Sequence, residues 1–278
     1  MKIIADSGAT KTDWCLINGS GEVQTVQTVG LNPYFLDEDE ILNVLRKDLY
    51  PYLDNKKVEQ VYFYGAGCAL PHKRQVLQFA LDMFFMHASV EVQNDLYGAA
   101  RALCGDKEGL VCILGTGASS CLYNGEEITE RLSSLGYVLG DEGSGAFLGK
   151  QLLAAYFRNE LPDHLQKLFA QKYGLELARV LDTLYRQPAP NRYLASFAEF
   201  LGENKSDTFV KDLVLSAFDI FFKKQVLRYE NSAKYPLSFS GSIAYIFSEE
   251  LKKSAKANGL KISKIVQTPL DGLLEFHK

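Results

Sequence analysis

Two short stretches of the sequence combine glycine with hydroxyl side chains in a pattern typical of phosphate-binding turns. The first is DSGATKTD at residues 6–13, and the second is GTGASS at residues 115–120. Each lies between two apolar, strand-like runs, and successive backbone N–H groups in such a turn can bind an anion. Two such hairpins could hold a polyphosphate between them. Duplication of a plain structural hairpin is the alternative interpretation.

The first stretch supplies several further groups for phosphate chemistry. The residues of this turn that could contact phosphate are Ser7, Gly8, Thr10, Lys11 and Thr12. Asp6 ends the preceding apolar run and could hold Mg²⁺ through water, because Mg²⁺ gives up its hydration shell reluctantly. The stretch is not a Walker A loop, since GxxxxGK[ST] is absent and a strand follows. Taken alone, it could also be an ordinary hairpin with polar turn residues.

A candidate general base follows the strand-like run SVEVQ. Asp95 stands there, at the start of an amphipathic helix expected over residues 96–104. The carboxyl end of a strand is where α/β proteins place reactive groups, so this carboxylate could accept a proton from a hydroxyl group. An aspartate in that place is also a good helix N-cap. The sequence leaves both interpretations open.

Two further stretches suggest ligand contacts through the backbone. In LGDEGSGAFLGK, Asp141 and Ser144 precede a long amphipathic helix, and capping explains part of this pattern. Three glycines around two acidic residues also indicate backbone held close to a ligand. In FSGSIAY, Gly241 lies between a strand and a helix, where a small-residue turn would let an adenosine approach. That second signal is weak, because such junctions are common.

The elements that must position these residues follow from hydrophobic periodicity. Strands are predicted at residues 2–5, 13–17, 22–29, 61–64, 90–93, 110–114 and 119–123, near PLSFSGS at 236–242, and at 262–267. Helices are predicted at 38–49, 73–87, 96–104 and 245–257, through most of 145–230, and at the C-terminus. Asn-Gly steps at 18–19 and 124–125 predict type I′ hairpins. The pattern therefore predicts two mixed α/β domains with a boundary near 107–109.

Composition excludes several classes of protein. The chain has 278 residues and a net charge of −4, which gives no sign of a nucleic-acid partner. No run approaches the roughly 20 apolar residues of a membrane span, and the N-terminus shows no secretory core, so we expect a cytoplasmic protein. The five cysteines form no CxxC pair, and the four histidines are scattered. We therefore expect buried, reduced thiols and no zinc site.

In this order, the stretches resemble the superfamily of actin, heat-shock chaperones and sugar kinases. More narrowly, the chain resembles the N-acetylglucosamine kinase group within the family that also holds dehydratase-activating ATPases. DSGATKTD matches the first phosphate loop, GTGAS the second, and SGSIA the adenosine loop, while ND at 94–95, GDEGSG and the closing PLDGLL also fit. The resemblance spans nearly the whole chain.

The resemblance implies two actin-like (ribonuclease H-like) α/β domains with a ligand cleft between them. The first would comprise residues 1–108 joined by the C-terminal helix 270–278. The second would comprise residues 109–269, with a helical insertion at about 150–230. A homodimer is a further expectation of the resemblance.

The implied activity is an ATP-dependent kinase acting on an amino sugar, N-acetylglucosamine at its 6-hydroxyl, with Mg²⁺. Asp95 would be the catalytic base and would contact the sugar, and Asp6 would position Mg²⁺. Sugar contacts would also come from Asn32, in GLNPYF, and Asp141. The residues implied at the nucleotide are Gly8, Thr10, Lys11, Thr116, Gly117, Gly241 and Ser242, with Thr116 and Gly117 also close to the substrate.

One stretch departs from the family pattern. The group usually carries GGWG before the LGDEGS motif, whereas this chain has SSLG at 133–136, so Leu135 stands where an aromatic residue would help form the sugar site. N-Acetylmuramic acid and glucosamine therefore remain alternative substrates. An iron–sulfur activator ATPase and a non-catalytic sugar sensor of the same fold are alternative functions. The first would need a cysteine pair, and no cysteine here lies in a cluster motif.

Overall fold

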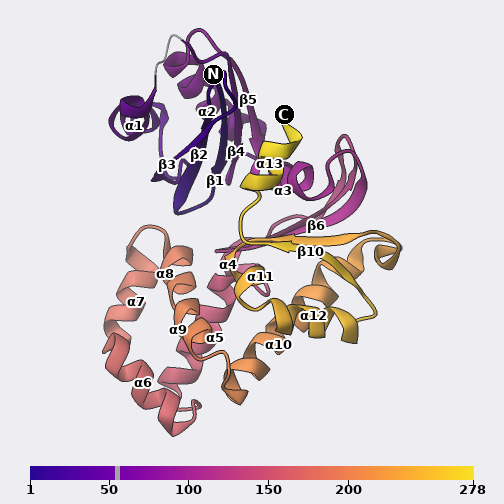
Figure 1. Ribbon diagram of the computed structural model, residues 1–278. Coiled ribbons are helices and arrows are strands. Elements are labelled where there is room, and N and C mark those ends of the chain that lie inside the picture. The colour runs from indigo at the N-terminus through magenta and orange to yellow at the C-terminus, as the bar shows by residue number, and fades with distance from the viewer. Residues whose placement is uncertain (54–56) are drawn as a thin grey trace. The chain divides into compact units, whose positions relative to one another are not determined.

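The computed structural model describes residues 1–53 and 57–278, and the chain divides into two compact units (Figure 1). Unit 1 comprises Met1–Lys107, Asn124–Ile128 and Thr268–Lys278. Unit 2 comprises Glu108–Tyr123 and Thr129–Gln267. Each unit is built on one mixed five-stranded sheet with helices, so the α/β class predicted from the sequence is confirmed.

The sheet of unit 1 has the order β3-β2-β1-β4-β5. Its strands are β1 (Lys2–Ser7), β2 (Lys11–Ile17), β3 (Val23–Val29), β4 (Gln60–Gly65) and β5 (Ser89–Asn94). β1 pairs antiparallel with β2 and parallel with β4, and β4 pairs parallel with β5. Because β1, β4 and β5 run in the same direction, their carboxyl ends lie at one edge of the sheet.

Helices cover both faces of this sheet (Figure 1). They are α1 (Glu38–Val44), a π-helical turn (Leu45–Leu49), a 3₁₀ turn (Tyr50–Tyr52), α2 (Pro71–Phe84), α3 (Asp95–Cys104) and α13 (Leu270–Phe276). Side chains alternate across a strand, so Ile3 of β1 packs in the cluster with α1 and α2, whereas Ile4 packs with α3 and α13. The C-terminal helix thus completes the core of the N-terminal unit.

The sheet of unit 2 has the order β8-β7-β6-β9-β10, which repeats the order of unit 1 strand for strand. Its strands are β6 (Glu108–Leu114), β7 (Ala118–Asn124), β8 (Ile128–Arg131), β9 (Leu237–Ser240) and β10 (Ile262–Val266). The two glycine-rich turns therefore occupy the same position in each sheet, between its first and second strands. This explains structurally why the sequence carries the motif twice.

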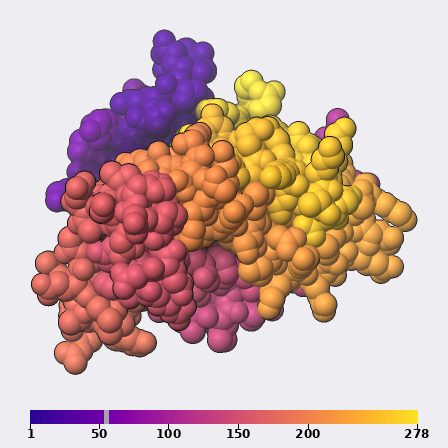
Figure 2. Space-filling view, turned by 90° about the horizontal axis from the view of Figure 1, so that it is seen from below, coloured from indigo at the N-terminus to yellow at the C-terminus, as the bar shows by residue number. Residues whose placement is uncertain are grey.

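Helices fill most of the remainder of unit 2. They are α4 (Gly136–Leu139), α5 (Gly145–Phe157), α6 (Asp163–Tyr173), α7 (Leu177–Arg186), α8 (Pro190–Ser196), α9 (Ala198–Glu203), α10 (Thr208–Lys224), α11 (Ser242–Ile246) and α12 (Ser248–Ala257), with 3₁₀ turns at Val226–Arg228 and Ser232–Lys234. Figure 2 shows the outer surface of the long helical insertion, coloured salmon to orange. Within the described residues, no helix has the length and apolarity needed to cross a bilayer.

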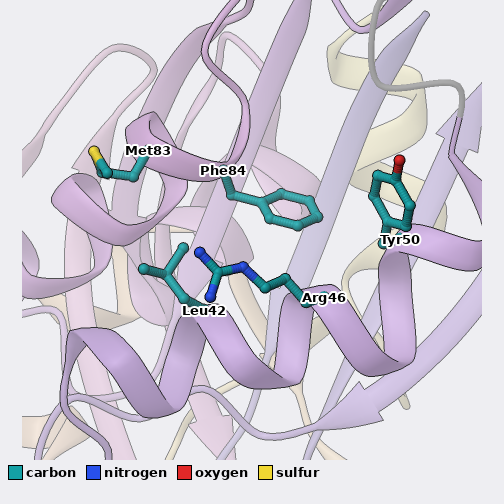
Figure 3. A pocket seen from close by; sticks show the side chains of 5 residues that line it. All are labelled: Leu42, Arg46, Tyr50, Met83 and Phe84. Carbon is teal, nitrogen blue, oxygen red and sulfur yellow. The ribbon is translucent and has the colours of Figure 1, made fainter.

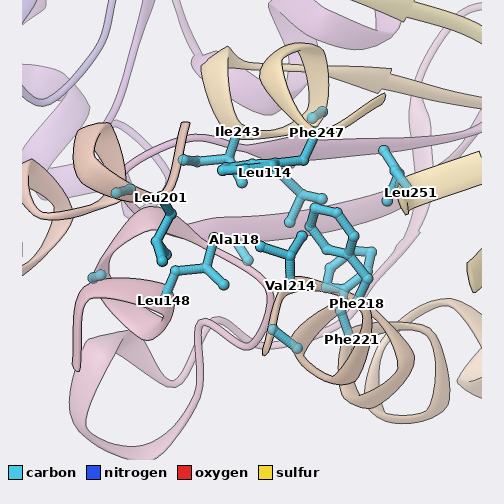
Figure 4. Packing of buried hydrophobic residues seen from close by; sticks show 14 of the residues in the cluster. Leu114, Ala118, Leu148, Leu201, Val214, Phe218, Phe221, Ile243, Phe247 and Leu251 are labelled. Carbon is cyan, nitrogen blue, oxygen red and sulfur yellow. The ribbon is translucent and has the colours of Figure 1, made fainter. Parts of the chain in front are cut away.

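The core of unit 2 gathers around α10. Its buried side chains recur at helical spacing, and they are Val210, Val214, Ala217, Phe218, Phe221 and Phe222. In Figure 4 the residues Val214, Phe218 and Phe221 lie beside side chains from the sheet and from α5, α9, α11 and α12. This packing holds β6, which leads into the second glycine-rich turn.

Both Asn-Gly hairpins form, but neither is the predicted type I′ turn. That type needs positive φ at both central residues. The first loop is longer, with Asn18 N–H bonded to Glu22 O, and its positive φ lies at Gly21. In the second loop only Gly125 has positive φ. The asparagines instead accept hydrogen bonds from the loop backbone, Asn18 from Ser20 and Glu22, and Asn124 from Glu126 and Glu127.

Candidate functional site

The first glycine-rich turn joins β1 to β2 through Gly8, Ala9 and Thr10. Gly8 N–H donates to Lys11 O at 2.9 Å, and Gly30 N–H donates to Thr10 O at 3.0 Å. In the described part of the chain, the N–H groups of Ala9 and Thr10 have no backbone acceptor. Adjacent unpaired N–H groups on a partly exposed turn are the donors that a phosphate oxygen requires.

Gly30 supports this turn by close packing. A Cβ at Gly30 would lie 2.5 Å from Gly8 O and 2.8 Å from Ala9 O, closer than atoms can approach. The end of β3 therefore touches the back of the turn and sets its position. The sequence analysis did not single out this glycine, because the contact depends on how β3 returns beside β2.

The hydroxyl groups of Ser7 and Thr12 do not have the role expected from the sequence. Both side chains are fully buried, and their oxygens lie 2.7 Å apart. Leu31 N–H donates to Ser7 Oγ at 3.1 Å, and Thr12 Oγ1 donates to Val29 O at 3.1 Å. The expectation that these two hydroxyl groups donate to phosphate is therefore corrected. Their hydrogen bonds instead join β1, β2 and the end of β3.

Thr10 and Lys11 remain accessible on the turn. Both are exposed, and Lys11 Nζ forms an ion pair with Asp13 Oδ2 at 2.8 Å. Gln27 Nε2 also donates to Asp13, at 2.7 Å. The Lys11 side chain is 57% exposed although Asp13 is only 13% exposed, so the ammonium group stays accessible to an anion at the turn.

Asp6 is the acidic residue closest in sequence to the turn. Its Oδ2 accepts a hydrogen bond from Thr268 Oγ1 at 3.3 Å. Burial, followed by the negative charges of Asp95 and Asp13, raises the pKa of Asp6 to about 7. A nearby cation would stabilise the ionised form of this carboxyl group, because a positive charge offsets both the cost of burial and the repulsion by the other acids.

Asp95 lies at the same edge of the sheet as Asp6. The register pairs Ser7 with Gly65 and Gly65 with Asn94, so the last residues of β1, β4 and β5 stand side by side. Asp95 follows directly as the first residue of α3. The N-cap is Asn94, whose side chain accepts from Tyr97 N–H at 2.8 Å, so the N-cap role considered for Asp95 is wrong. The Asp95 carboxylate instead accepts from Leu96 N–H at 2.9 Å.

Asn32 is nearly buried at the start of the loop after β3. Its side-chain oxygen accepts from Tyr34 N–H at 2.9 Å, and its carbonyl accepts from Phe35 N–H. The side chain packs against Gly67, where a Cβ would overlap it. Its orientation is therefore fixed by two loops of unit 1.

Unit 1 also carries two cavities lined by none of these residues. Figure 3 shows the side chains that line the first, of about 390 Å³: Leu42, Arg46 and Tyr50, with Met83 and Phe84 of α2. The second, of about 400 Å³, is lined by the loop after Asn32, by the start of α1 and by α2.

The second glycine-rich turn, Gly115–Gly117, caps helix α5. Gly145 N–H donates to Gly115 O at 2.8 Å, and Ala146 N–H donates to Thr116 O at 3.0 Å. Ser144 Oγ accepts from Phe147 N–H at 3.2 Å. The first three N–H groups of α5, which a helix normally leaves unpaired, are thus satisfied. Turn and helix form one rigid piece.

Asp141 lies against this second turn. It adopts a left-handed conformation with φ of 55°, and its Oδ1 accepts from Ala118 N–H at 3.2 Å. A Cβ on Gly117 would lie 3.0 Å from Asp141 Oδ2. Burial is the main cause that raises the pKa of Asp141. A left-handed backbone and a half-buried acid in one residue are typical of a functional site.

The candidate adenosine residues lie beside the same turn. Gly241 has φ of 120°, and a Cβ there would overlap the carbonyl group of Leu114. Ser242, the next residue, is exposed and begins α11. Unit 2 therefore brings together Thr116, Gly117, Asp141 and Gly241, which are far apart in the sequence.

The acids of unit 1 fit a magnesium ion that keeps its water molecules. In residues 1–53 and 57–278 no group of three or more His, Cys, Asp or Glu side chains could hold a metal ion. Mg²⁺ in nucleotide sites usually needs only one or two carboxylates together with phosphate oxygens. Asp6, with its raised pKa beside Asp95, matches that requirement.

The cysteines are not among the candidate site residues of unit 1 or of unit 2. Cys15, Cys68, Cys112 and Cys121 are buried, Cys104 is half-buried, and all five are free thiols. Burial raises the pKa of Cys15, Cys68 and Cys112, which makes these thiols poor nucleophiles and poor metal ligands.

Comparison with solved structures identifies the family. The crystal structure named "Putative N-acetylglucosamine Kinase" from Porphyromonas gingivalis is 43% identical, with a TM-score of 0.94, and the match covers 100% of this chain and 98% of that one. The chain belongs to the N-acetylglucosamine kinase-like family of actin-like sugar kinases. No protein-family model matches the chain, and no curated protein does.

More distant structures share the fold of this family. A second "Putative N-acetylglucosamine Kinase", from Chromobacterium violaceum, is 17% identical with a TM-score of 0.73 over 100% of this chain and 99% of that one. A ROK family glucokinase from Streptomyces griseus, in complex with glucose and AMPPNP, is 16% identical with a TM-score of 0.60 over 99% and 97%. The actin-like fold expected from the sequence is therefore confirmed.

Proposed function

We propose that this protein is an ATP-dependent kinase that phosphorylates an amino sugar, with N-acetylglucosamine at its 6-hydroxyl as the leading acceptor. The observation that carries the proposal is the edge of the unit 1 sheet, where the glycine-rich turn, Asp6 and Asp95 meet. Membership of a sugar kinase family supports it.

The proposed reaction uses Asp95 as the general base. The sugar hydroxyl oxygen bonds to the γ-phosphorus, the bond from that phosphorus to the bridging oxygen breaks, and ADP leaves. The hydroxyl proton passes to the Asp95 carboxylate. Because phosphoryl transfer needs mainly positioning and charge stabilisation, a well-placed base contributes about 10²- to 10⁴-fold.

The phosphate groups are proposed to bind the first turn through Gly8, the N–H groups of Ala9 and Thr10, and Lys11. Mg²⁺, held through water by Asp6, would offset charge on the phosphates. Thr116 and Gly117 are proposed as further phosphate contacts, and Gly241 with Ser242 as contacts of the adenosine. Their backbones are held rigidly by α5 and β6, which supports this role.

The acceptor is proposed to be bound by Asn32, Asp141 and Asp95. Asn32 and Asp141 are each fixed by a hydrogen bond from a backbone N–H. A site of fixed polar groups discriminates strongly between sugars that do and do not match it. Leu135 is 57% exposed, so a sugar beside it could carry a larger or charged substituent. N-Acetylmuramic acid and glucosamine therefore belong among the substrates to test.

The test is release of ADP from ATP and Mg²⁺ by the purified protein with a panel of acceptors. The panel contains N-acetylglucosamine, its 6-deoxy analogue, glucosamine, N-acetylmuramic acid and glucose, with Asp95→Asn as the background. We expect the highest kcat/KM with N-acetylglucosamine and none with the 6-deoxy analogue. Activity no higher than the Asp95→Asn background with every sugar would refute the proposal.

A further inference from the structure

Thr268 connects the candidate magnesium residue to the C-terminal segment. It is the first residue of unit 1 after the chain leaves unit 2. Its Oγ1 donates to Asp6 Oδ2 at 3.3 Å and accepts from Leu270 N–H at 3.4 Å. Since Leu270 supplies a donor, the hydroxyl proton is directed to Asp6.

The helix that follows Thr268 is anchored at its middle and at its far end. At its middle, a Cβ on Gly272 would overlap Ala102 O, so α13 lies directly on α3. At its far end, the His277 ring stacks on Tyr62 with centroids 3.8 Å apart, and Tyr64 Oη lies 2.7 Å from His277 Nε2. The position of Thr268 is therefore set by a packed helix and not by a loose tail.

The charges around Asp6 indicate what the hydrogen bond from Thr268 contributes. Asp95 and Asp13 both act on Asp6 as like charges, while Lys11 is exposed and paired with Asp13. Thr268 supplies a neutral donor to one carboxylate oxygen without competing for a cation. Donors of this kind orient carboxylates that hold metal ions, and their loss commonly weakens metal binding.

We propose that Thr268 is a positioning residue, which binds Oδ2 of Asp6 so that the carboxylate presents its other oxygen to the hydrated Mg²⁺ of a bound nucleotide. This inference rests on the proposed function, in which Asp6 positions Mg²⁺. It assigns a role in the nucleotide site to the segment that follows β10.

The experiment measures ADP affinity by calorimetry with and without Mg²⁺, using the full chain. Thr268→Val keeps the side-chain shape and removes the donor, and Thr268→Ser keeps the donor. Thr183→Val is the matched control, because that hydroxyl binds only a carbonyl within α7. A thermal melt of each variant shows whether the fold is retained.

We expect Thr268→Val to reduce the Mg²⁺-dependent gain in ADP affinity by about tenfold, while ADP affinity without Mg²⁺ stays unchanged. Thr268→Ser should restore the gain, and Thr183→Val should match the wild type. An unchanged gain in Thr268→Val, or an equal loss with and without Mg²⁺, overturns the inference alone. A wild-type protein that gains nothing from Mg²⁺ overturns both the inference and the proposed role of Asp6.

Discussion

The side-chain oxygen of Asn94 accepts a hydrogen bond from Tyr97 N–H at 2.8 Å, which makes Asn94 the N-cap of α3. The neighbouring Asp95 is the first residue of the helix and not its N-cap, and its Oδ1 accepts from the adjacent Leu96 N–H at 2.9 Å. Two adjacent polar residues thus have separable roles, one in stability and one in the proposed chemistry. Substituting each in turn distinguishes these roles.

Asp95→Asn should lower kcat by about 10²- to 10⁴-fold, because it removes the proposed general base. Stability should change by less than about 1 kcal/mol, since a first-turn acid contributes no more than that to a helix. ADP release under saturating sugar, combined with urea unfolding, measures both effects. Turnover close to that of the wild type would exclude Asp95 as the base.

Asn94→Ala should show the opposite pattern. Loss of an N-cap costs about 1 kcal/mol of unfolding free energy, whereas Asp95 keeps its carboxylate. Urea unfolding should register the loss, and kcat at a temperature well below the melting transition should stay within about twofold of the wild type. A large loss of kcat with intact stability would mean that Asn94 contacts the reactants.

Gly30→Ala should weaken nucleotide binding indirectly, by displacing the first glycine-rich turn. The added methyl group would push against Gly8 O and Ala9 O and displace the first turn. A displacement that costs about 1.4 kcal/mol lowers affinity tenfold, which calorimetry with ADP and Mg²⁺ can measure. Gly19→Ala is the matched control, because nothing lies within 4 Å of a Cβ there.

The raised pKa of Asp6 predicts a pH-dependent stability for the metal-free protein. Its pKa is about 7 in the folded chain and 3.8 in the reference state, so between these values the folded state binds more protons. The contribution of Asp6 to stability therefore falls as the pH rises from about 4 to about 7.

Asp6→Asn should remove this dependence. Between pH 5 and pH 8, the unfolding free energy of the wild type should fall by more than about 1 kcal/mol relative to that of the variant. One pKa unit corresponds to about 1.4 kcal/mol. Guanidinium unfolding at both pH values without divalent metal measures the difference. Parallel pH profiles for the two proteins would show that Asp6 ionises normally.

Much of the fold could be predicted from the sequence because its strands are strongly apolar. The runs around β1, β4 and β6 are buried on both faces, and such continuous runs are distinctive. The short strand β8 was not located, because three of its four residues are exposed and its sequence, ITER, has no strong pattern. The type I′ prediction for the two Asn-Gly hairpins was wrong. The residue with positive φ depends on the backbone hydrogen bonds of each loop and not on the Asn-Gly step alone.

The site was less predictable where its contacts join distant segments. Gly30 and Thr268 each support a candidate residue through a contact set by the way the chain returns to the first turn or to β1. Conversely, the hydroxyls of Ser7 and Thr12 fitted a phosphate-binding motif by residue type. Which way a side chain faces on β1 and β2 decided that they are buried.

The location of residues 268–278 has a consequence for synthesis of the protein. Their helix completes the core of unit 1, yet the ribosome makes it after every residue of unit 2. Domains generally fold as units, in the order in which they emerge. Here residues 1–107 are translated before the helix that packs on Ile4, Cys15 and Ala102, so a nascent chain arrested near residue 260 should leave these apolar side chains accessible to chaperones.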